Sequence, residues 1–360
     1  MYREEKALVL KVTYENENIQ HLITDRGAKR ALLYKQLTKR ATVGDYVIVN
    51  TTATALQLGT GGWDIVRYVL TEDEDVTLRG DGHIMKVRYT PVQHSVLAVE
   101  EKDSPYHDTF KRRFSLRHRH VLLAELHSMV PLIFYIAVQM KKDVRCCVIF
   151  DDQASLALAM SRHLNELHKN PSFTSVTVGQ AFGGQFEAVT VASALQFAEQ
   201  IVQPDLIAIS VGPGVVGTGT VYGFSGMAMA NWSHTVSALD GVPVWIPRLS
   251  FAEKRERHYG LSHHTLTPLS QFTFKKAILP FPYLNKEQLR RIKDQLKSVT
   301  FQTEHDFRFA TTNDVATFVE QALKSAPFPI ETMGRGFHED PVFFFAVAEA
   351  VRIALIERSL

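Results

Sequence analysis

The residues with the densest reactive chemistry lie in the stretch RERHYGLSHHTLTPL, which runs from Arg255 to Leu269. Histidine is the usual general acid or base near neutral pH, and arginine can hold a carboxylate or a phosphate through two hydrogen bonds. We therefore expect His263 or His264 to move a proton and Arg257 to orient an anionic ligand. Two further residues of this stretch are predicted to bind the ligand: His258 and Ser262.

Two other kinds of site fit this stretch less well. The spacing of the three histidines does not match a structural zinc site, and adjacent histidines rarely bind one metal from a regular element, although a loop would allow it. We therefore assign no metal ligands. A triad of Ser262, His263 and Asp151 is conceivable, but the chain lacks the G-x-S-x-G turn that presents a nucleophilic serine.

A glycine-rich loop, VGPGVVGTGTVYGFSG, occupies residues 211–226 directly after an apolar run. Gly212, Gly214 and Gly217 match the G-x-G-x-x-G spacing of dinucleotide sites, where the backbone approaches a pyrophosphate at a helix N-terminus. However, the next strand ends near Arg248, where a nicotinamide site needs an acidic residue. An arginine there could hold the 2′-phosphate of NADP, which leaves NADP as a weak alternative.

The loop also lacks the lysine of an ATPase P-loop, because Thr218 stands in its place. The remaining prediction is generic: backbone amides and hydroxyl groups could bind a phosphate, a carboxylate or an oxyanion. A tight turn that packs a helix against the sheet explains the glycines equally well. The residues predicted to bind the anion are Gly212, Gly214, Gly217, Thr218, Gly219 and Thr220.

Further polar residues stand near the carboxyl ends of two predicted strands. Asp151 and Asp152 follow the strand 146–150 and could assist a proton transfer, and Arg248 could orient the anion. Ligands of a mostly parallel sheet bind outside the carboxyl ends of its strands. We therefore expect these side chains to share one edge of the sheet with the glycine loop and the histidines.

The elements that must position these residues alternate between strand and helix from about residue 145 onward. This rhythm predicts right-handed crossovers and a mostly parallel, doubly wound, Rossmann-like α/β sheet. The predicted strands are 146–150, 175–180, 205–212, 242–250, 275–281 and 307–311, and the predicted helices are 151–169, 186–202, 223–239, 285–299, 313–325 and one that begins at Asp340-Pro341. Residues between 250 and 275 are expected to be irregular.

The first hundred residues have a different pattern. Short runs rich in Val, Tyr, Thr and Leu alternate with turn signals, which predicts a small β-barrel or sandwich. The predicted strands are 6–15, 21–26, 31–37, 44–53, 63–70, 84–90 and 94–101. We therefore divide the chain into a barrel-like domain, residues 1–104, and an α/β domain with the ligand site, residues 105–360.

Length, composition and charge exclude several classes of protein. The chain has 360 residues, of which 45% are hydrophobic and 22% charged, and its net charge is +2. It therefore fits a globular protein of two domains, and its bulk charge does not favour nucleic acid or an anionic membrane. The basic run at Lys111–His120 leaves RNA binding, together with the β-domain, as a weaker alternative.

Cellular location and assembly are also constrained. The two adjacent cysteines, Cys146 and Cys147, cannot form a disulfide framework, and the charged N-terminus predicts no signal peptide, so we expect a cytoplasmic protein. Residues 121–140 contain too many polar groups for a membrane span and are expected to form a buried helix bent at Pro131. The apolar last helix would be buried or lie at a homodimer interface.

Several long motifs carry a resemblance to a known family. They are VGPGVVGTGTVYGFSG, RLSFAEKRERHYGLSHHTLT, DDQASLALAMS and AFGGQFEAV, with LQLGTGGWD and MKVRYTPVQ in the N-terminal part. In this order they closely resemble an uncharacterised bacterial family, catalogued as domain of unknown function 3866, over essentially the whole chain. The resemblance implies a bacterial, cytoplasmic protein of about this length. It implies no activity, cofactor or catalytic residue.

The residues themselves favour an enzyme, either a hydrolase or a group transferase, that acts on a small anionic or phosphorylated ligand bound at the glycine-rich loop. The first alternative is a non-catalytic metabolite-binding or assembly protein that uses the same site. The cofactor stays unassigned at this level.

Overall fold

The computed structural model describes residues 1–58, 60–70, 82–152 and 157–356, apart from the side chain of Asp152. The chain divides into two compact units, each with its own apolar core. The first unit comprises Met1–Leu97 with Ala157–Met160, and the second comprises Ala98–Leu156 with Ser161–Leu360.

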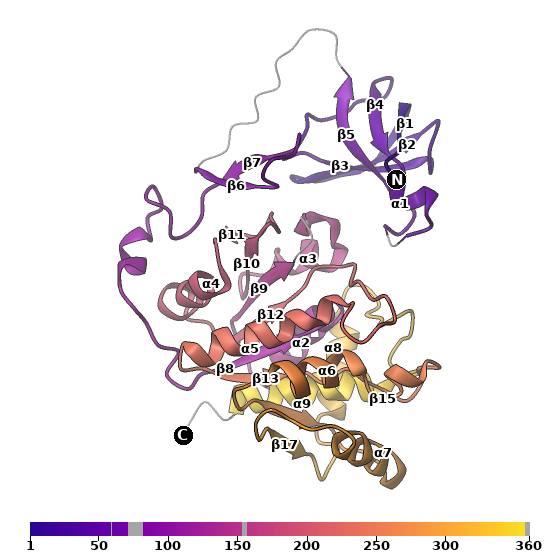
Figure 1. Cartoon of the computed structure of the whole chain (residues 1–360). Helices are drawn as coiled ribbons and strands as arrows, with labels where there is room; N and C mark the ends of the chain where they lie inside the picture. Colours follow the sequence, from indigo (N-terminus) through magenta and orange to yellow (C-terminus); the bar gives the residue numbers. More distant parts are fainter. Residues whose placement is uncertain (59, 71–81, 153–156, 357–360) are drawn as a thin grey trace. The chain divides into compact units, whose positions relative to one another are not determined.

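The first unit is built on a closed five-stranded barrel (Figure 1). Around the barrel the order is β1 (Glu4–Glu15), β2 (Ile19–Thr24), β3 (Arg30–Tyr34), β5 (Asp64–Leu70) and β4 (Tyr46–Asn50), and a short helix, α1, spans Thr52–Ala55. The long strand β1 pairs with β4 through its first half and with β2 through its second half, which closes the barrel. The strands β6 (Ile84–Lys86) and β7 (His94–Val96) pair separately as a hairpin.

Alternation along the barrel strands produces its core. In β1, for example, Ala7 and Val9 are buried while Leu8 and Leu10 are not, so the strand places every second residue inside. Small and branched side chains fill the interior: Ala7, Val9, Leu22, Ala31, Leu33, Ala41, Val47, Val49, Val66 and Val69. The barrel confirms the predicted N-terminal all-β unit.

The second unit contains an eight-stranded sheet in which all neighbouring strands are parallel. Its order is β11 (Phe186–Glu187), β10 (Phe173–Gly179), β9 (Cys146–Asp152), β12 (Leu206–Ser210), β8 (His120–Ala124), β13 (Val242–Trp245), β16 (Ile278–Phe281) and β17 (Asp306–Phe309). From β8 the chain moves to β9 and β10 on one side, returns through β12, and continues to β13, β16 and β17 on the other side. The carboxyl ends of β12, β8 and β13 therefore lie at the point where the winding reverses, which is where open α/β sheets bind ligands.

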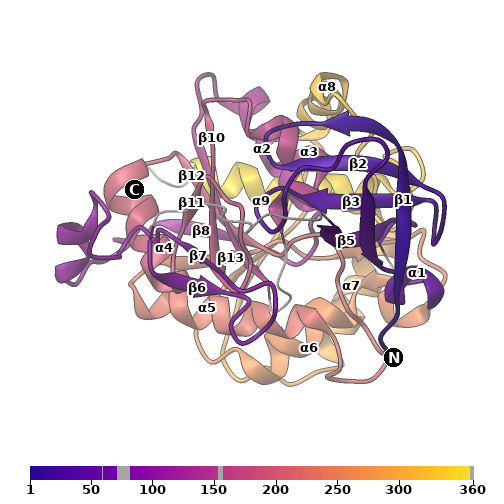
Figure 2. The same ribbon diagram turned by 90° about the horizontal axis from the view of Figure 1, so that it is seen from above.

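Helices cover both faces of this sheet, which confirms the predicted Rossmann-like arrangement (Figures 1 and 2). One face is covered by α4 (Val191–Phe197) and α5 (Ala228–Ala238), and the other by α2 (Met129–Met140), α8 (Ala316–Ser325) and α9 (Pro341–Ile356). Both α5 and α9 pack on β8 and β13, from opposite sides. The remaining helical segments are η1 (His107–Lys111), η2 (Leu158–Met160), α3 (Arg162–Leu167), η3 (Ala198–Val202), η4 (Ser225–Met227), η5 (Glu256–His258), α6 (His263–Phe272) and α7 (Lys286–Lys297).

The helix predicted over residues 121–140 is wrong in its first part. Residues 120–124 form β8, the central strand of the sheet, and the helix α2 begins only at Met129. A short, continuous apolar run fits a fully buried strand as well as a buried helix, so periodicity could not separate the two. Pro131 lies in the first turn of α2, where no intrahelical bond is lost, and therefore does not bend the helix.

Other predicted segments also differ from the structure. The helix predicted over residues 186–202 begins only with α4 at Val191, because Phe186–Glu187 form β11. The stretch between residues 250 and 275 is not irregular: β14 (Leu249–Ser250) pairs with β15 (Gly260–Leu261), and α6 follows directly. The helix predicted from residue 151 is reduced to η2 and the short α3, and residues 153–156 of that prediction lie outside the described part. The last helix begins at Pro341, as predicted, and is buried within its own unit.

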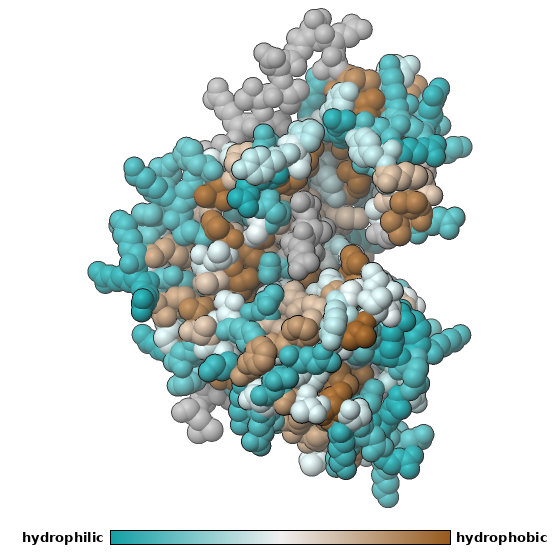
Figure 3. Space-filling view, viewed as in Figure 1, coloured by the Kyte–Doolittle hydropathy of each residue, from teal (hydrophilic) through white to brown (hydrophobic). Residues whose placement is uncertain are grey.

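Surface and membrane properties follow from these elements. Hydrophilic residues are interspersed with smaller hydrophobic patches on the face drawn in Figure 3. Within the described ranges, no helix has both the length and the apolar composition needed to cross a membrane.

Candidate functional site

The candidate site lies at the carboxyl ends of β8, β12 and β13, where short pairings bring separate segments together. The pairing of β14 with β15 places Arg248, just before β14, next to Ser262, just after β15. The backbone N–H of Ser262 donates to the carbonyl of Arg248 (2.9 Å), and the backbone N–H of Arg248 donates to Thr265 Oγ1 (3.1 Å). These two hydrogen bonds hold Arg248 against the first turn of α6, which carries His263 and His264.

A buried charged triangle forms the centre of the site. Glu125 follows β8, and its Oε1 lies 2.9 Å from Arg248 Nη1 and 3.0 Å from His264 Nδ1. Arg248 Nη1 also lies 3.1 Å from His264 Nδ1. The side chains of Glu125, Arg248 and His264 are 1%, 8% and 8% exposed. We assign the proton of His264 to Nδ1, because Glu125 Oε1 then accepts from both neighbours. In this tautomer the lone pair of His264 is on Nε2.

Electrostatics keep this carboxylate charged. Burial raises the pKa of Glu125, but the positive charge of Arg248 and the hydrogen bond from His264 outweigh burial, so the pKa lies below its ordinary value. The second oxygen, Oε2, is buried and has no hydrogen-bond partner among the described residues. A Cβ on Gly226 would lie 3.2 Å from the carboxyl carbon of Glu125, so this glycine allows the backbone before α5 to pack against the carboxylate.

Three histidine rings converge beside the triangle. The ring centroids of His258, His263 and His264 lie between 4.4 and 5.0 Å from one another. Burial lowers the pKa of His258 to about 3 and that of His263 to about 4, and the positive charge of Arg248 adds to both shifts. Because of these low pKa values, both His258 and His263 are neutral near pH 7. Phe224, from the glycine loop, stacks on the ring of His264 at 3.9 Å between centroids.

Ser262 forms hydrogen bonds with two of these histidines, His258 and His264, and so has a positioning role rather than that of a nucleophile. Its Oγ caps α6 by accepting from the backbone N–H of His264 (3.2 Å) and lies 2.7 Å from His258 Nδ1. Arg257 Nε donates to His258 Nε2 (3.2 Å), so the lone pair of His258 is on Nε2 and its Nδ1 donates to Ser262. Arg257 itself is exposed.

The glycine-rich loop lies next to this cluster and is closed by its own hydrogen bonds. The N–H of Thr218 donates to the carbonyl of Gly223 (2.9 Å), and Thr218 Oγ1 lies 2.9 Å from Thr220 Oγ1. A Cβ on Gly217 would lie 3.3 Å from Cε1 and 3.6 Å from Nε2 of His264. A Cβ on Gly219 would lie 3.3 Å from Arg257 Nη1. The loop therefore contacts the edge of His264 that carries Nε2, and also Arg257.

The other predicted residues of the loop are less closely tied to the histidines. Gly214 has a φ of +103° with open space around its Cα, so a side chain there would be strained by the backbone and not by contacts. Gly212 stands at the start of the loop, and Thr220 Oγ1 accepts from the N–H of Gly223 (3.1 Å). The helix α5 begins only at Ala228, so eight or more residues separate Gly217, Thr218 and Gly219 from the helix N-terminus.

The two aspartates occupy a neighbouring strand end. Asp151 is half-buried, and its Oδ2 accepts a hydrogen bond from Trp232 Nε1 of α5 (2.6 Å). Burial raises the pKa of Asp151. The structure thus ties Asp151 to α5, and its described contacts do not include the histidines. The side chain of Asp152 lies outside what the structure describes, so both aspartates remain predictions as catalytic groups.

Sequence reasoning missed Glu125. Glu125 lies within residues 121–140, for which the sequence predicts a helix. This prediction conceals that Glu125 directly follows the strand β8. A single charged residue directly after an apolar run of four, VLLA, is the signal that could have revealed it. Phe224 was also missed, because an aromatic residue in a loop gives no sign of the ring against which it stacks.

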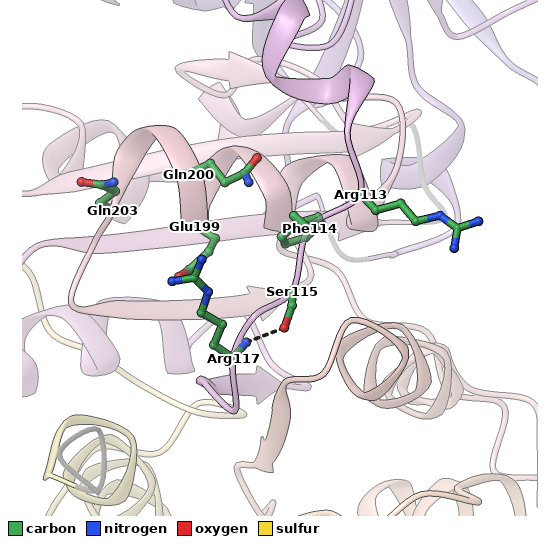
Figure 4. A pocket seen from close by; sticks show the side chains of 7 residues that line it. All are labelled: Arg113, Phe114, Ser115, Arg117, Glu199, Gln200 and Gln203. Atoms are coloured by element: carbon green, nitrogen blue, oxygen red, sulfur yellow. Dashed lines mark hydrogen bonds between the residues drawn. The ribbon is translucent and has the colours of Figure 1, made fainter.

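A surface pocket of about 520 Å³ lies at the opposite, amino-terminal edge of the sheet. Its lining residues come from the segment before β8 and the segment before β12: Arg113, Phe114, Ser115, Arg117, Glu199, Gln200 and Gln203. Figure 4 shows Arg113 turned away from the other side chains and Arg117 next to Glu199. Two arginines and one glutamate thus line this pocket, and the glutamate is paired with Arg119, which is not one of the lining residues.

The basic run at Lys111–His120 is partly balanced by acids of its own unit. Lys111 pairs with Asp108 (2.6 Å), and Arg119 pairs with Glu199 (2.5 Å). These pairs reduce the positive potential that binding to a nucleic acid would require.

Comparison with known proteins places the chain in one family. No curated protein matches the chain. No solved structure matches it either. One family model, described as "Protein of unknown function (DUF3866)", matches residues 30–351, which is most of the 360-residue chain and includes every residue of the cluster. The chain therefore belongs to the DUF3866 family.

Proposed function

We propose that the α/β unit is an enzyme, a hydrolase or group transferase, that acts on a small anionic or phosphorylated ligand at the carboxyl edge of its sheet. The observation that carries this proposal is the buried contact between Glu125 and His264 at the point where the winding reverses. A carboxylate that fixes the tautomer of an imidazole gives it a defined basic nitrogen, Nε2, for chemistry. Burying such a charged group is costly, and function is a common reason for it.

The surroundings of this nitrogen suggest the class of ligand. The loop residue Gly217 approaches the Nε2 edge of His264, and Gly219 approaches the guanidinium of Arg257. A ligand held between the loop and Arg257 would therefore lie beside Nε2. Because Arg257 is exposed and its described hydrogen bond is to a neutral histidine rather than to a carboxylate, its charge can bind an anion.

Arg257→Ala tests ligand binding, and His264→Gln tests catalysis. We expect phosphate or a phosphorylated compound to raise the melting temperature of the wild-type protein, and Arg257→Ala to lose most of that shift. Arg290→Ala, which removes an exposed arginine of α7, is the matched control and should keep it. An equal shift in Arg257→Ala, or the absence of a shift with every anion tested, would refute the proposed ligand class.

The catalytic part of the proposal is tested by His264→Gln. With a ligand identified from the shifts, this variant should still bind but should lose at least about 100-fold in kcat, because the basic nitrogen is removed while Arg257 remains. Normal turnover in a folded His264→Gln variant would contradict the assigned role. Ligand binding without turnover in the wild type would instead support a metabolite-binding protein.

A further inference from the structure

The three converging histidines have a geometry that the proposed function does not require. One ligand atom from each of His258, His263 and His264 can be chosen so that all three atoms lie within 4.8 Å of one another. The side chains come from η5 and from the first turn of α6, which Ser262 links through two hydrogen bonds. A tetrahedral metal ion with nitrogen ligands at about 2.1 Å needs its ligand atoms about 3.4 Å apart. Small side-chain rotations would close the remaining distance.

The outer hydrogen bonds fit the pattern of metal-bound histidines. A histidine that binds a metal through one nitrogen usually donates its other N–H to a carboxylate, a carbonyl or another acceptor, which fixes its orientation. His264 Nδ1 lies 3.0 Å from Glu125 Oε1, and His258 Nδ1 lies 2.7 Å from Ser262 Oγ. When Nδ1 carries the proton in both rings, these contacts leave the lone pair on Nε2, which is then the nitrogen through which each ring could bind a metal.

An unsatisfied atom gives independent support. His263 Nε2 is buried and has no hydrogen-bond partner among the described residues. A buried nitrogen without a partner is destabilising, so proteins rarely keep one without a reason. A metal ion shared with His258 and His264 would satisfy this nitrogen.

The nearby arginines do not exclude a cation. Arg248 is paired with the carboxylate of Glu125, so the buried pair carries no net charge. Arg257 Nε donates to His258 Nε2, at the position where a metal would bind. Because the side chain of Arg257 is exposed, it can move away and remain next to the metal as an anion-binding group.

We propose that His258, His263 and His264 bind one divalent transition-metal ion of the zinc type, with Glu125 and Ser262 as positioning residues. Three imidazoles without a thiolate suit zinc and similar metals, and three protein ligands leave a fourth position open, as in catalytic sites. This inference rests on the proposed function only for the role of the metal, which would bind the anionic ligand or a water molecule at the open position. With the metal bound, His264 Nε2 would be a ligand and not a base, so a metal-bound water would take its place in the proposed reaction. Binding of the metal itself does not depend on that function.

The test is a titration of the full-length protein, stripped with a chelator, with Zn²⁺ and with Co²⁺. We expect one ion per chain by calorimetry and elemental analysis, and intense visible absorption of the Co²⁺ form, which indicates tetrahedral coordination. His263→Ala should weaken affinity at least 100-fold. His118→Ala, which removes a histidine whose side chain is 82% exposed, is the matched control and should bind normally.

A second variant keeps the test decisive if His263→Ala does not fold. His263→Gln keeps the size and polarity of this side chain, and we expect it to lower the metal affinity at least 10-fold because an amide binds zinc more weakly than an imidazole. Glu125→Gln, measured on folded protein, removes no ligand and should lower the affinity 10- to 100-fold because His264 loses its orienting carboxylate. Absence of binding to the wild type, or equal affinity in folded His263→Ala, would overturn the metal site. An active enzyme that binds no metal would refute this inference alone, whereas metal binding without anion binding or turnover would refute only the proposed function.

Discussion

At the residue scale, the pair of Glu125 and Arg248 is the most demanding feature of the site. Both side chains are almost fully buried, and Arg248 Nη1 donates to Glu125 Oε1 at 2.9 Å. Breaking a buried pair by removing one partner typically costs about 3–5 kcal/mol, because the remaining charge is left without compensation. A surface pair would cost about 1 kcal/mol or less.

We therefore expect Glu125→Gln to lower the free energy of unfolding by about 3–5 kcal/mol, measured by urea denaturation at neutral pH. The double variant Glu125→Gln with Arg248→Met should recover part of this loss, because no charge is then left unpaired. A cost of less than about 1 kcal/mol for Glu125→Gln would show that the carboxylate is not buried as described.

A second prediction at this scale concerns pH and a histidine outside the cluster. His127 Nδ1 lies 3.2 Å from the carbonyl oxygen of Val211, and its Nε2 lies 2.7 Å from Ser161 Oγ. Burial lowers the pKa of His127 to about 4, although the Val211 carbonyl acts in the opposite direction. Between about pH 6.5 and pH 4 the unfolded chain therefore binds more protons than the folded one, so stability falls as the pH falls.

The contribution of His127 to this loss should reach about 3 kcal/mol near pH 4. We expect the unfolding free energy of the wild type to fall more steeply between pH 7 and pH 4.5 than that of His127→Gln. His118→Gln, at an exposed position, should keep the wild-type slope. Identical slopes in wild type and His127→Gln would contradict the lowered pKa of His127 in the folded protein.

At the scale of elements, the sequence predicted most of the sheet and its helices. CCVIF and DLIAIS are short, largely apolar runs that end at two aspartates and at the glycine-rich loop, respectively, and the structure confirms both as strands. The barrel strands were equally readable, because alternation and turn residues mark them locally. Asp340 before Pro341 marked the start of α9 for the same reason.

The remaining elements depended on contacts that are distant in the sequence. Residues 120–124 become a strand because neighbours on both sides, β12 and β13, complete its hydrogen bonds. The start of α6 depends on the cap at Ser262, whose two histidine neighbours obscure the helical pattern. The candidate site was therefore predicted only in part: Arg248 and the histidines were identified, and their central carboxylate at Glu125 was not.

At the scale of the whole molecule, the site and its supporting core belong to one unit. Every residue of the cluster lies in the α/β unit, while the barrel has a separate core. Within the α/β unit the two edges of the sheet differ in chemistry. The carboxyl edge carries the cluster and the glycine loop, and the amino edge carries the pocket drawn in Figure 4.

The central claim, that an anion binds at the carboxyl edge, is tested most directly by crystals of the protein soaked with tungstate. Tungstate resembles phosphate, and its anomalous scattering locates it without ambiguity. We predict a peak within hydrogen-bond reach of Arg257 and next to the Nε2 edge of His264. A peak only in the pocket lined by Arg113 and Arg117, or no peak near Arg257 at millimolar tungstate, would contradict the account.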